Sequence, residues 1–151
     1  MSEDPRLRLL LDRAEISDLM LAFGAALDAK DWQAYGEVFA EDASFTILGQ
    51  TRRGREAIIA GPERDLERFD ALQHFSCNHR IAVDGDEARA SHYLLAVHVP
   101  DAAEPAAHAD IGGRYDCHCV RTTEGWRFAE VELSVLWSAG SRFEIEHDGD
   151  A

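Results

Sequence analysis

Residues 73–99, QHFSCNHRIAVDGDEARASHYLLAVHV, contain the pattern that decides the fold class. Asp84-Gly85-Asp86 is a tight-turn sequence, and Ile81 and Val83 lead into it with the alternation of a half-buried strand. Residues 88–99 follow the turn with a second long run of strand composition. The stretch therefore predicts an antiparallel hairpin of two long strands.

The same pattern continues toward the C-terminus. Residues 112–122 and 126–137 have strand composition, and Thr123-Glu124-Gly125 is a second turn sequence between them. Residues 100–109 are rich in alanine and proline and are expected to form a loop. These four strands are predicted to form one antiparallel meander.

Helical patterns precede the hairpin. Between residues 6 and 29, apolar side chains recur at i, i+3, i+4, i+7 and i+11 and draw one stripe: Ile16, Leu19, Met20, Phe23 and Leu27. A short helix is expected after Asp31, a candidate N-cap, with three aromatic residues on one face: Trp32, Tyr35 and Phe39. Residues 55–72 are also expected to be helical, interrupted at Gly61-Pro62 because proline would begin a new helix there.

This order of elements predicts the α+β class. A short strand, residues 43–49, is expected between the second and third helical segments. Helices first and a long meander afterwards favour helices packed on one face of a curved, mostly antiparallel sheet. Such a sheet, closed at one end by helices, leaves a cone-shaped cavity, which is a natural site for a small molecule. Residues 1–142 are expected to form this single domain, followed by an acidic tail, residues 143–151.

Composition excludes several classes of function. The 151 residues include 29 acidic and 15 basic side chains, so the formal charge is −14. Such a charge repels phosphate backbones and anionic membrane surfaces, so neither nucleic acid nor a membrane is an expected partner. No apolar run approaches the roughly 20 residues of a membrane span, and residues 1–5 do not resemble a signal peptide. Three cysteines are an odd number, which favours reduced thiols and a cytoplasmic location.

Two polar residues are the leading candidates for catalysis. Asp28 ends the first predicted helix, where a carboxylate meets the negative end of the helix dipole. His74 opens a long strand, and imidazole is the side chain best suited to general-base work near neutral pH. Each also has a plain structural interpretation, as a solvated turn residue and as a surface histidine.

Strand alternation adds further candidates. It groups Asn78 with His74 and Ser76 on one face, and places His79 mainly on the other. On the next strand, His98 shares a face with apolar neighbours, which suits a pocket residue or a hydrogen-bonded core residue. The third strand of the meander places Tyr115 on its inner face with Cys117, Cys119 and, at the end, Arg121. Arg121 is therefore either a carboxylate partner or a side chain that extends to solvent.

No metal or cofactor is expected. The seven histidines form no HxH or HExxH pattern, and Cys117-His118-Cys119 directs its imidazole away from its two thiols. The sequence also has no glycine-rich phosphate loop and no GxSxG motif.

Several short motifs occur in an order that resembles a known family. They are Asp28-x-x-Asp31-Trp32, Phe39-x-x-Asp42-Ala43, Gly54-x-x-x-Ile58, His74-x-x-x-Asn78, Tyr115 and Gly125-Trp126-Arg127-Phe128. Together they resemble the SnoaL-like branch of the nuclear transport factor 2-like superfamily, over about residues 8–140. The resemblance implies a cone-shaped α+β barrel with a deep apolar pocket, and it implies a homo-oligomer, a dimer or a trimer.

Within that superfamily the pattern is most similar to scytalone dehydratase and hexachlorocyclohexane dehydrochlorinase. The resemblance implies an aspartate–histidine dyad at Asp28 and His74, a second pocket histidine at His98 and a pocket arginine at Arg121. Two departures are Leu27 and, approximately, Ile47, which replace the tyrosines of the dehydratase. A third is Phe23, which replaces the pocket lysine of the dehydrochlorinase. Scytalone itself is therefore not the expected substrate.

The expected function is that of a cofactor-independent lyase, of dehydratase or dehydrohalogenase type, acting on a small apolar and cyclic molecule. His74 would remove a proton from carbon, Asp28 would orient it, and His98 or Tyr115 would supply an acid. Phe23, Asn78 and Trp137 are expected to join Tyr115 and Arg121 in binding the substrate. Two alternatives remain open: a non-catalytic ligand-binding or small-subunit assembly domain, and an isomerase or polyketide cyclase that uses the same base.

Overall fold

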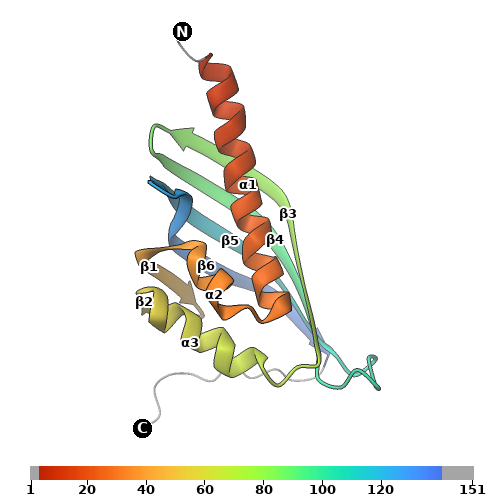
Figure 1. The fold of residues 1–151 in the computed structure, drawn as a ribbon. Coiled ribbons are helices and arrows are strands. Elements are labelled where there is room, and N and C mark those ends of the chain that lie inside the picture. The colour runs from red at the N-terminus through yellow and green to blue at the C-terminus, as the bar shows by residue number, and fades with distance from the viewer. Residues whose placement is uncertain (1–3, 141–151) are drawn as a thin grey trace.

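Residues 4–140 are described by a computed structural model of the chain (Figure 1). The helices in chain order are α1 (Pro5–Ala29), α2 (Trp32–Glu37) and α3 (Arg55–Leu66). The strands are β1 (Phe39–Ile47), β2 (Gln50–Arg53), β3 (Ala71–Asp84), β4 (Glu87–Val99), β5 (Ala109–Thr122) and β6 (Gly125–Gly140). The expected α+β class is confirmed. The proposed acidic tail, residues 143–151, lies outside the described residues.

The sheet is curved and mostly antiparallel. Its strand order is β2-β1-β6-β5-β4-β3, and β1 with β6 is its parallel pair. β2 and β3 form the two edges, so the sheet does not close on itself, and together with the helices it makes the expected α+β cone. The helices pack against its inner face and complete the wall of the cone (Figure 1).

The first helix forms where the apolar stripe predicts it. Asp4 caps its start by accepting a hydrogen bond from the backbone N–H of Arg6, and Pro5 occupies the first turn, where its missing N–H costs nothing. Lys30 ends the helix in the left-handed conformation. All five stripe residues are buried against the sheet: Ile16, Leu19, Met20, Phe23 and Leu27.

α1 and β3 lie close together at Gly24. A Cβ at this position would stand 3.4 Å from the carbonyl oxygen of His74 and 3.5 Å from its Cβ. A methyl group at position 24 would be in van der Waals contact with His74, so side chains larger than alanine would press on the start of β3. The close approach brings the last turn of the helix to the first residues of the strand.

The third helical segment differs from the expectation. α3 continues through Pro62 without a break and ends at Leu66, short of residue 72. Proline has a helical φ of its own, and Ile58 and Leu66, two turns apart, are both buried and hold the two halves in line. Phe39 lies in β1 rather than in the preceding helix, and the short edge strand β2 was not expected.

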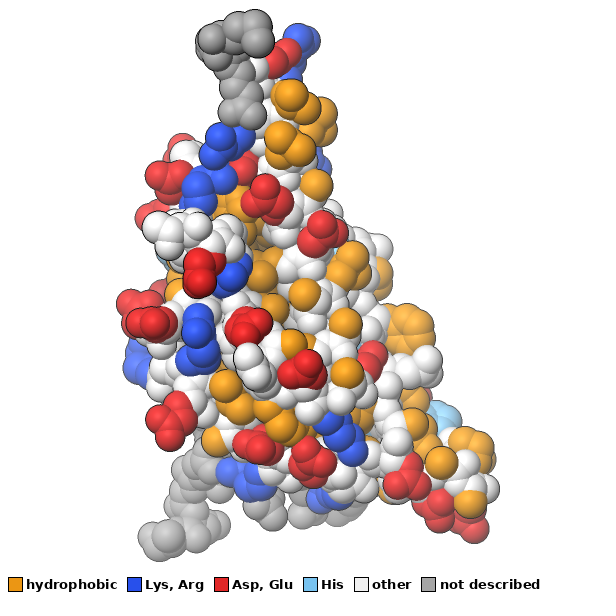
Figure 2. Space-filling view, in the orientation of Figure 1, with side chains coloured by type: hydrophobic (Ala, Val, Ile, Leu, Met, Phe, Trp, Pro, Cys, Tyr) orange, Lys and Arg blue, Asp and Glu red, His pale blue; other side chains and the backbone are white. Residues whose placement is uncertain are grey.

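The surface that carries the helices has both charged and hydrophobic side chains. Acidic side chains are spread over this face, and hydrophobic side chains gather along the first turns of α1 (Figure 2). Leu7, Leu10 and Leu11 are 51%, 64% and 46% exposed there. No helix in the described part of the chain combines the length and apolar character needed to cross a membrane.

Candidate functional site

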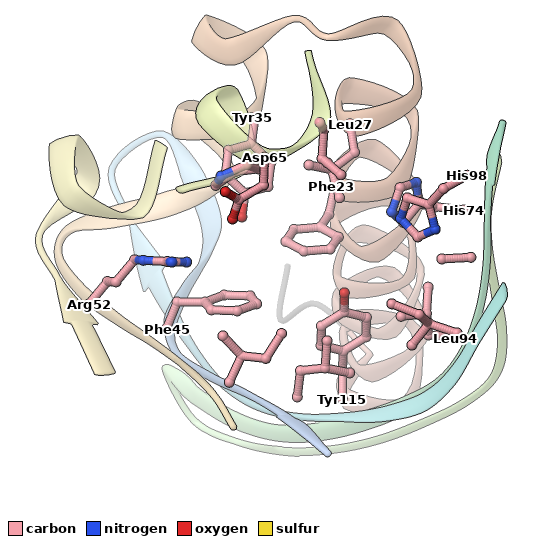
Figure 3. A pocket seen from close by; sticks show the side chains of 16 residues that line it. Phe23, Leu27, Tyr35, Phe45, Arg52, Asp65, His74, Leu94, His98 and Tyr115 are labelled. Atoms are coloured by element: carbon pink, nitrogen blue, oxygen red, sulfur yellow. The ribbon is translucent and has the colours of Figure 1, made fainter. Parts of the chain in front are cut away.

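A cavity of about 90 Å³ lies between the sheet and the helices (Figure 3). Its walls are mainly apolar and include Phe23, Leu27, Phe45, Leu66, Leu94 and Leu133. Polar side chains enter it at opposite ends, with His74 and His98 at one and Arg52, Tyr35 and Asp65 at the other (Figure 3). An apolar cavity of ~150 Å³ holds a benzene molecule in another protein, so this smaller cavity limits a ligand to one small ring at most.

Asp28 and His74 form a direct pair at the first end. The Nδ1 atom of His74 lies 2.7 Å from Oδ1 of Asp28. The backbone N–H of His74 donates to the same carboxylate, at 2.9 Å to Oδ1 and 3.1 Å to Oδ2. Since a carboxylate only accepts hydrogen bonds, Nδ1 carries the proton and Nε2 keeps its lone pair. The His74 side chain is 7% exposed, whereas that of Asp28 is 33% exposed.

His98 lies beside His74, and its ring is buried. The two rings meet edge to face with their centroids 5.7 Å apart. Burial lowers the pKa of His98 to about 4, and repulsion between protonated rings of His98 and His74 is a smaller cause. Its Nδ1 lies 3.2 Å from the carbonyl oxygen of Ala109, so that nitrogen donates and Nε2 accepts. A neutral imidazole in this tautomer has no proton to give from Nε2, so His98 is better placed to accept a hydrogen bond than to act as the expected acid.

Tyr115 forms the floor of the cavity. It is 4% exposed, and its ring lies 5.3 Å from that of Phe23 in an edge-to-face contact. Burial raises the pKa of its hydroxyl well above the usual value, so the group stays protonated and can donate a hydrogen bond. Phe23 also contacts Tyr35, Phe39, Phe45 and Phe128, and this cluster gives the apolar wall a rigid centre.

Arg121 does not line the cavity, which corrects its expected place in the site. Its guanidinium donates to both oxygens of Asp12, at 2.7 and 2.9 Å, and to Asp86 at 2.8 Å. Asp12 also accepts from Nε1 of Trp126, and the guanidinium lies 4.5 Å over that ring. The hydrogen bonds from Arg121 lower the pKa of Asp12. The arginine therefore ties the first half of α1 to the end of β5, a structural role.

Asn78 also lies outside the cavity, because a bulge changes the strand alternation. Asn78 has a φ of 56°, and the register between β3 and β4 shifts between Cys77 and Arg80. The extra residue turns His79 inward, contrary to the expectation. There Nε2 of His79 lies 2.8 Å from Oγ of Ser76, and Nδ1 lies 2.7 Å from Oγ of Ser17.

Trp137 faces outward as well, since β5 and β6 shift register between Gly112 and Gly113. A Cβ at Gly112 would overlap the indole of Trp137, so the ring lies flat over this glycine. Trp137 is 50% exposed.

The residues at the far end of the cavity were not among the candidates. Arg52 comes from the edge strand β2, Tyr35 from α2 and Asp65 from α3. The sequence offered one indication, an aspartate one position before a core leucine in a helical segment, which is an unusual place for a carboxylate. Among residues 4–140, no three His, Cys, Asp or Glu side chains are grouped to hold a metal ion.

An open curved sheet with helices over its inner face and a cavity between them defines the NTF2-like class of fold. Residues 8–132 match the model of the SnoaL-like domain, and the chain therefore belongs to this family. An NTF2-like protein with a cystatin-like fold from Novosphingobium aromaticivorans is 29% identical, with 87% of this chain and 86% of that chain covered and a TM-score of 0.77.

Two further structures share the fold at lower identity. A candidate scytalone dehydratase from Novosphingobium aromaticivorans is 22% identical, with a TM-score of 0.80 over 94% of this chain and 96% of that chain. A type 2 hexachlorocyclohexane dehydrochlorinase is 20% identical, with a TM-score of 0.79 over 94% of this chain and 97% of that chain. The expected family and fold are thus confirmed.

Proposed function

We propose that this protein is a cofactor-independent lyase in which His74 removes a proton from a carbon atom of a small, apolar, cyclic molecule. The observation that carries the proposal is the 2.7 Å contact between Asp28 and His74 at one end of an apolar cavity. A carboxylate on Nδ1 holds the basic lone pair on Nε2 and stabilises the imidazolium that forms after proton transfer. Two proteins of similar fold have names that denote eliminations, a dehydratase and a dehydrochlorinase.

The elimination balances without any added reactant. Nε2 of His74 takes the proton, the C–H electron pair becomes the new carbon–carbon double bond, and the leaving group departs with its own pair. Chloride needs no proton. A departing hydroxyl takes a proton from the His74 imidazolium and leaves as water, while the protonated Tyr115 hydroxyl donates a hydrogen bond. Proton transfer by a positioned base contributes roughly 10²–10⁴-fold, and the apolar walls exclude competing water.

Untargeted mass spectrometry of a metabolite extract tests the reaction class. Wild-type protein and His108→Ala should both convert one compound into a product lighter by water or by a hydrogen halide. His74→Ala should not. His108 is the matched control because it is a loop histidine, 37% exposed, that does not line the cavity. A product of unchanged mass would indicate an isomerase or a cyclase, and equal extracts for wild type and His74→Ala would contradict catalysis by His74.

Asp28→Asn tests the dyad itself. The amide keeps the shape of the carboxylate and can still accept from the backbone N–H of His74, so the fold should persist. It carries no charge to stabilise the imidazolium, and we expect kcat to fall by about 10²-fold or more. A kcat within twofold of wild type would contradict the role of Asp28.

A non-catalytic assembly domain is the second candidate, and one observation favours it. Phe75, Leu95 and Trp137 are 49%, 38% and 50% exposed on the outer face of the sheet. Exposed apolar patches mark interaction sites. A homo-oligomeric enzyme would use this face for a second copy, whereas an assembly subunit would use it for a different chain, and purification of the native protein from its own cells separates the two.

A further inference from the structure

The end of the cavity opposite His74 is polar, although nothing in the proposed proton transfer uses it. Arg52, Tyr35 and Asp65 meet there from three different elements and face the apolar space between the two ends (Figure 3). Tyr35 is 2% exposed and Asp65 is 9% exposed. Polar groups that converge in an otherwise apolar pocket fix the orientation of a ligand.

Arg52 reaches this place because α3 leaves room for it. A Cβ at Gly61 would overlap the guanidinium of Arg52, so the side chain passes directly over the glycine. Any larger residue at position 61 would have to push the guanidinium aside. Gly61 therefore determines where the guanidinium of Arg52 lies.

Tyr35 supplies a second donor at the same end. Burial raises the pKa of its hydroxyl, while the nearby charge of Arg52 acts in the opposite direction. The hydroxyl is protonated at neutral pH and donates hydrogen bonds.

The charged groups at this end of the cavity favour a ligand with a neutral hydrogen-bond acceptor over an anionic ligand. Nε of Arg64 donates to Oδ1 of Asp65 at 2.9 Å and offsets part of the negative charge of that carboxylate. The carboxylate would still repel an anionic ligand group next to Arg52. A carbonyl oxygen has partial negative charge and two lone pairs, so it accepts from both Arg52 and Tyr35 without that repulsion.

We propose that Arg52 and Tyr35 form a binding site for a carbonyl oxygen, and that the substrate is a single-ring carbonyl compound whose acidic C–H faces His74. The orientation toward His74 rests on the proposed function, whereas the carbonyl site rests on the far end of the cavity alone. When the proton leaves a carbon conjugated with the carbonyl, the C–H electron pair moves toward the oxygen, where two donors stabilise the developing charge.

Two isosteric probes test the carbonyl site, cyclohexanone and methylenecyclohexane, in which a CH₂ group replaces the oxygen. NMR titrations of the full chain measure the ratio of ketone affinity to alkene affinity, since the alkene leaves water more readily and the absolute affinities differ for that reason alone. This ratio, the ketone preference, should be about tenfold lower in Arg52→Met than in wild-type protein, because a charged donor strengthens the hydrogen bond. His74→Ala should keep the wild-type ratio, and an unchanged ratio in Arg52→Met would overturn the inference.

Gly61→Ala provides a second variant that keeps every charge. The added methyl group displaces the guanidinium, so the ketone preference should fall several-fold even though Arg52 is present. An unchanged preference in this variant would also overturn the inference. Since the probes report binding alone, a ketone preference that depends on Arg52 in a protein without turnover would contradict the proposed function and leave the carbonyl site standing.

Discussion

His92 and His98 are two histidines that face the core from the same strand. They are 3% and 2% exposed, and burial lowers the pKa of each to about 4. A smaller cause for His92 is the charge on His79. Nδ1 of His92 lies 2.7 Å from Oγ of Ser76, and its ring stacks on Tyr115 at 4.8 Å. Both histidines are therefore neutral parts of the packed interior at pH 7.

The pH dependence of stability follows from these two residues. Between pH 6.5 and 4 the unfolded chain binds more protons at these two histidines than the folded protein does. Their contribution to the free energy of unfolding is therefore fully present above pH 6.5 and is lost as the pH is lowered toward 4. The slope is at most about 1.4 kcal/mol per pH unit for each histidine. Urea unfolding at pH 7 and pH 5 should show this loss, and His92→Gln should reduce it. A loss as large in His92→Gln as in His108→Gln would contradict the role of His92.

At the scale of elements, α1 controls the geometry of the site. Asp12 anchors its first half to Arg121 at the end of β5, and Gly24 allows its second half to lie on β3. The carboxylate of Asp28 then contacts His74 near the start of β3. These two contacts fix the position of α1 on the sheet, and with it the distance between Asp28 and His74.

Gly24→Leu should separate these two residues. A Cβ at position 24 would already be in contact with His74, so the larger leucine side chain should push α1 and β3 apart. Overpacking of this kind costs typically 1–3 kcal/mol. We expect a lower Tm and a loss of activity of at least tenfold. Ala25→Leu is the matched control because Ala25 is the exposed neighbour on the same helix. Equal activity of the two variants would show that the approach of α1 to β3 does not set the site.

At the scale of the whole molecule, the outer face of the sheet carries an apolar row. Phe75 pairs with Leu95, Leu95 with Gly112, and Gly112 with Trp137, so the row crosses four strands from β3 to β6. Gly112 contributes by letting the Trp137 ring lie flat on the sheet. A continuous apolar row of this length is suited to a second copy of the same face, as in the homo-oligomer that the family resemblance implies.

Leu95→Lys places a charge in the middle of this row and should shift the protein toward the monomer. Light scattering after size-exclusion chromatography should give a dimer or trimer mass for the wild type. Leu48→Lys is the control because Leu48 is 53% exposed at the turn between β1 and β2, away from the row. A wild-type monomer at tens of micromolar, or equal masses for the two variants, would contradict assembly through this face.

Local periodicity determined most of the elements of this protein. The stripe on α1, the hairpin around Gly85 and the inward faces of β4 and β5 all follow from residues within one or two turns or pleats of each other, so a reader of the sequence can recover them. Local periodicity could not pair Asp28 with His74, because 46 residues separate them and no local pattern connects them. The resemblance to a known family indicated that the two residues form a pair.

Tertiary structure decided what periodicity could not. The bulge at Asn78 and the register shift at Gly112 each move one residue relative to its partner strand, and a shift of one residue reverses which face a side chain occupies. Arg121 has the same inward alternation as Tyr115, yet α1 presents Asp12 to it and removes it from the cavity. Arg52, Tyr35 and Asp65 converge only because three separate elements pack together. Sequence therefore specified the elements, while the contacts between distant elements selected which polar groups face the cavity.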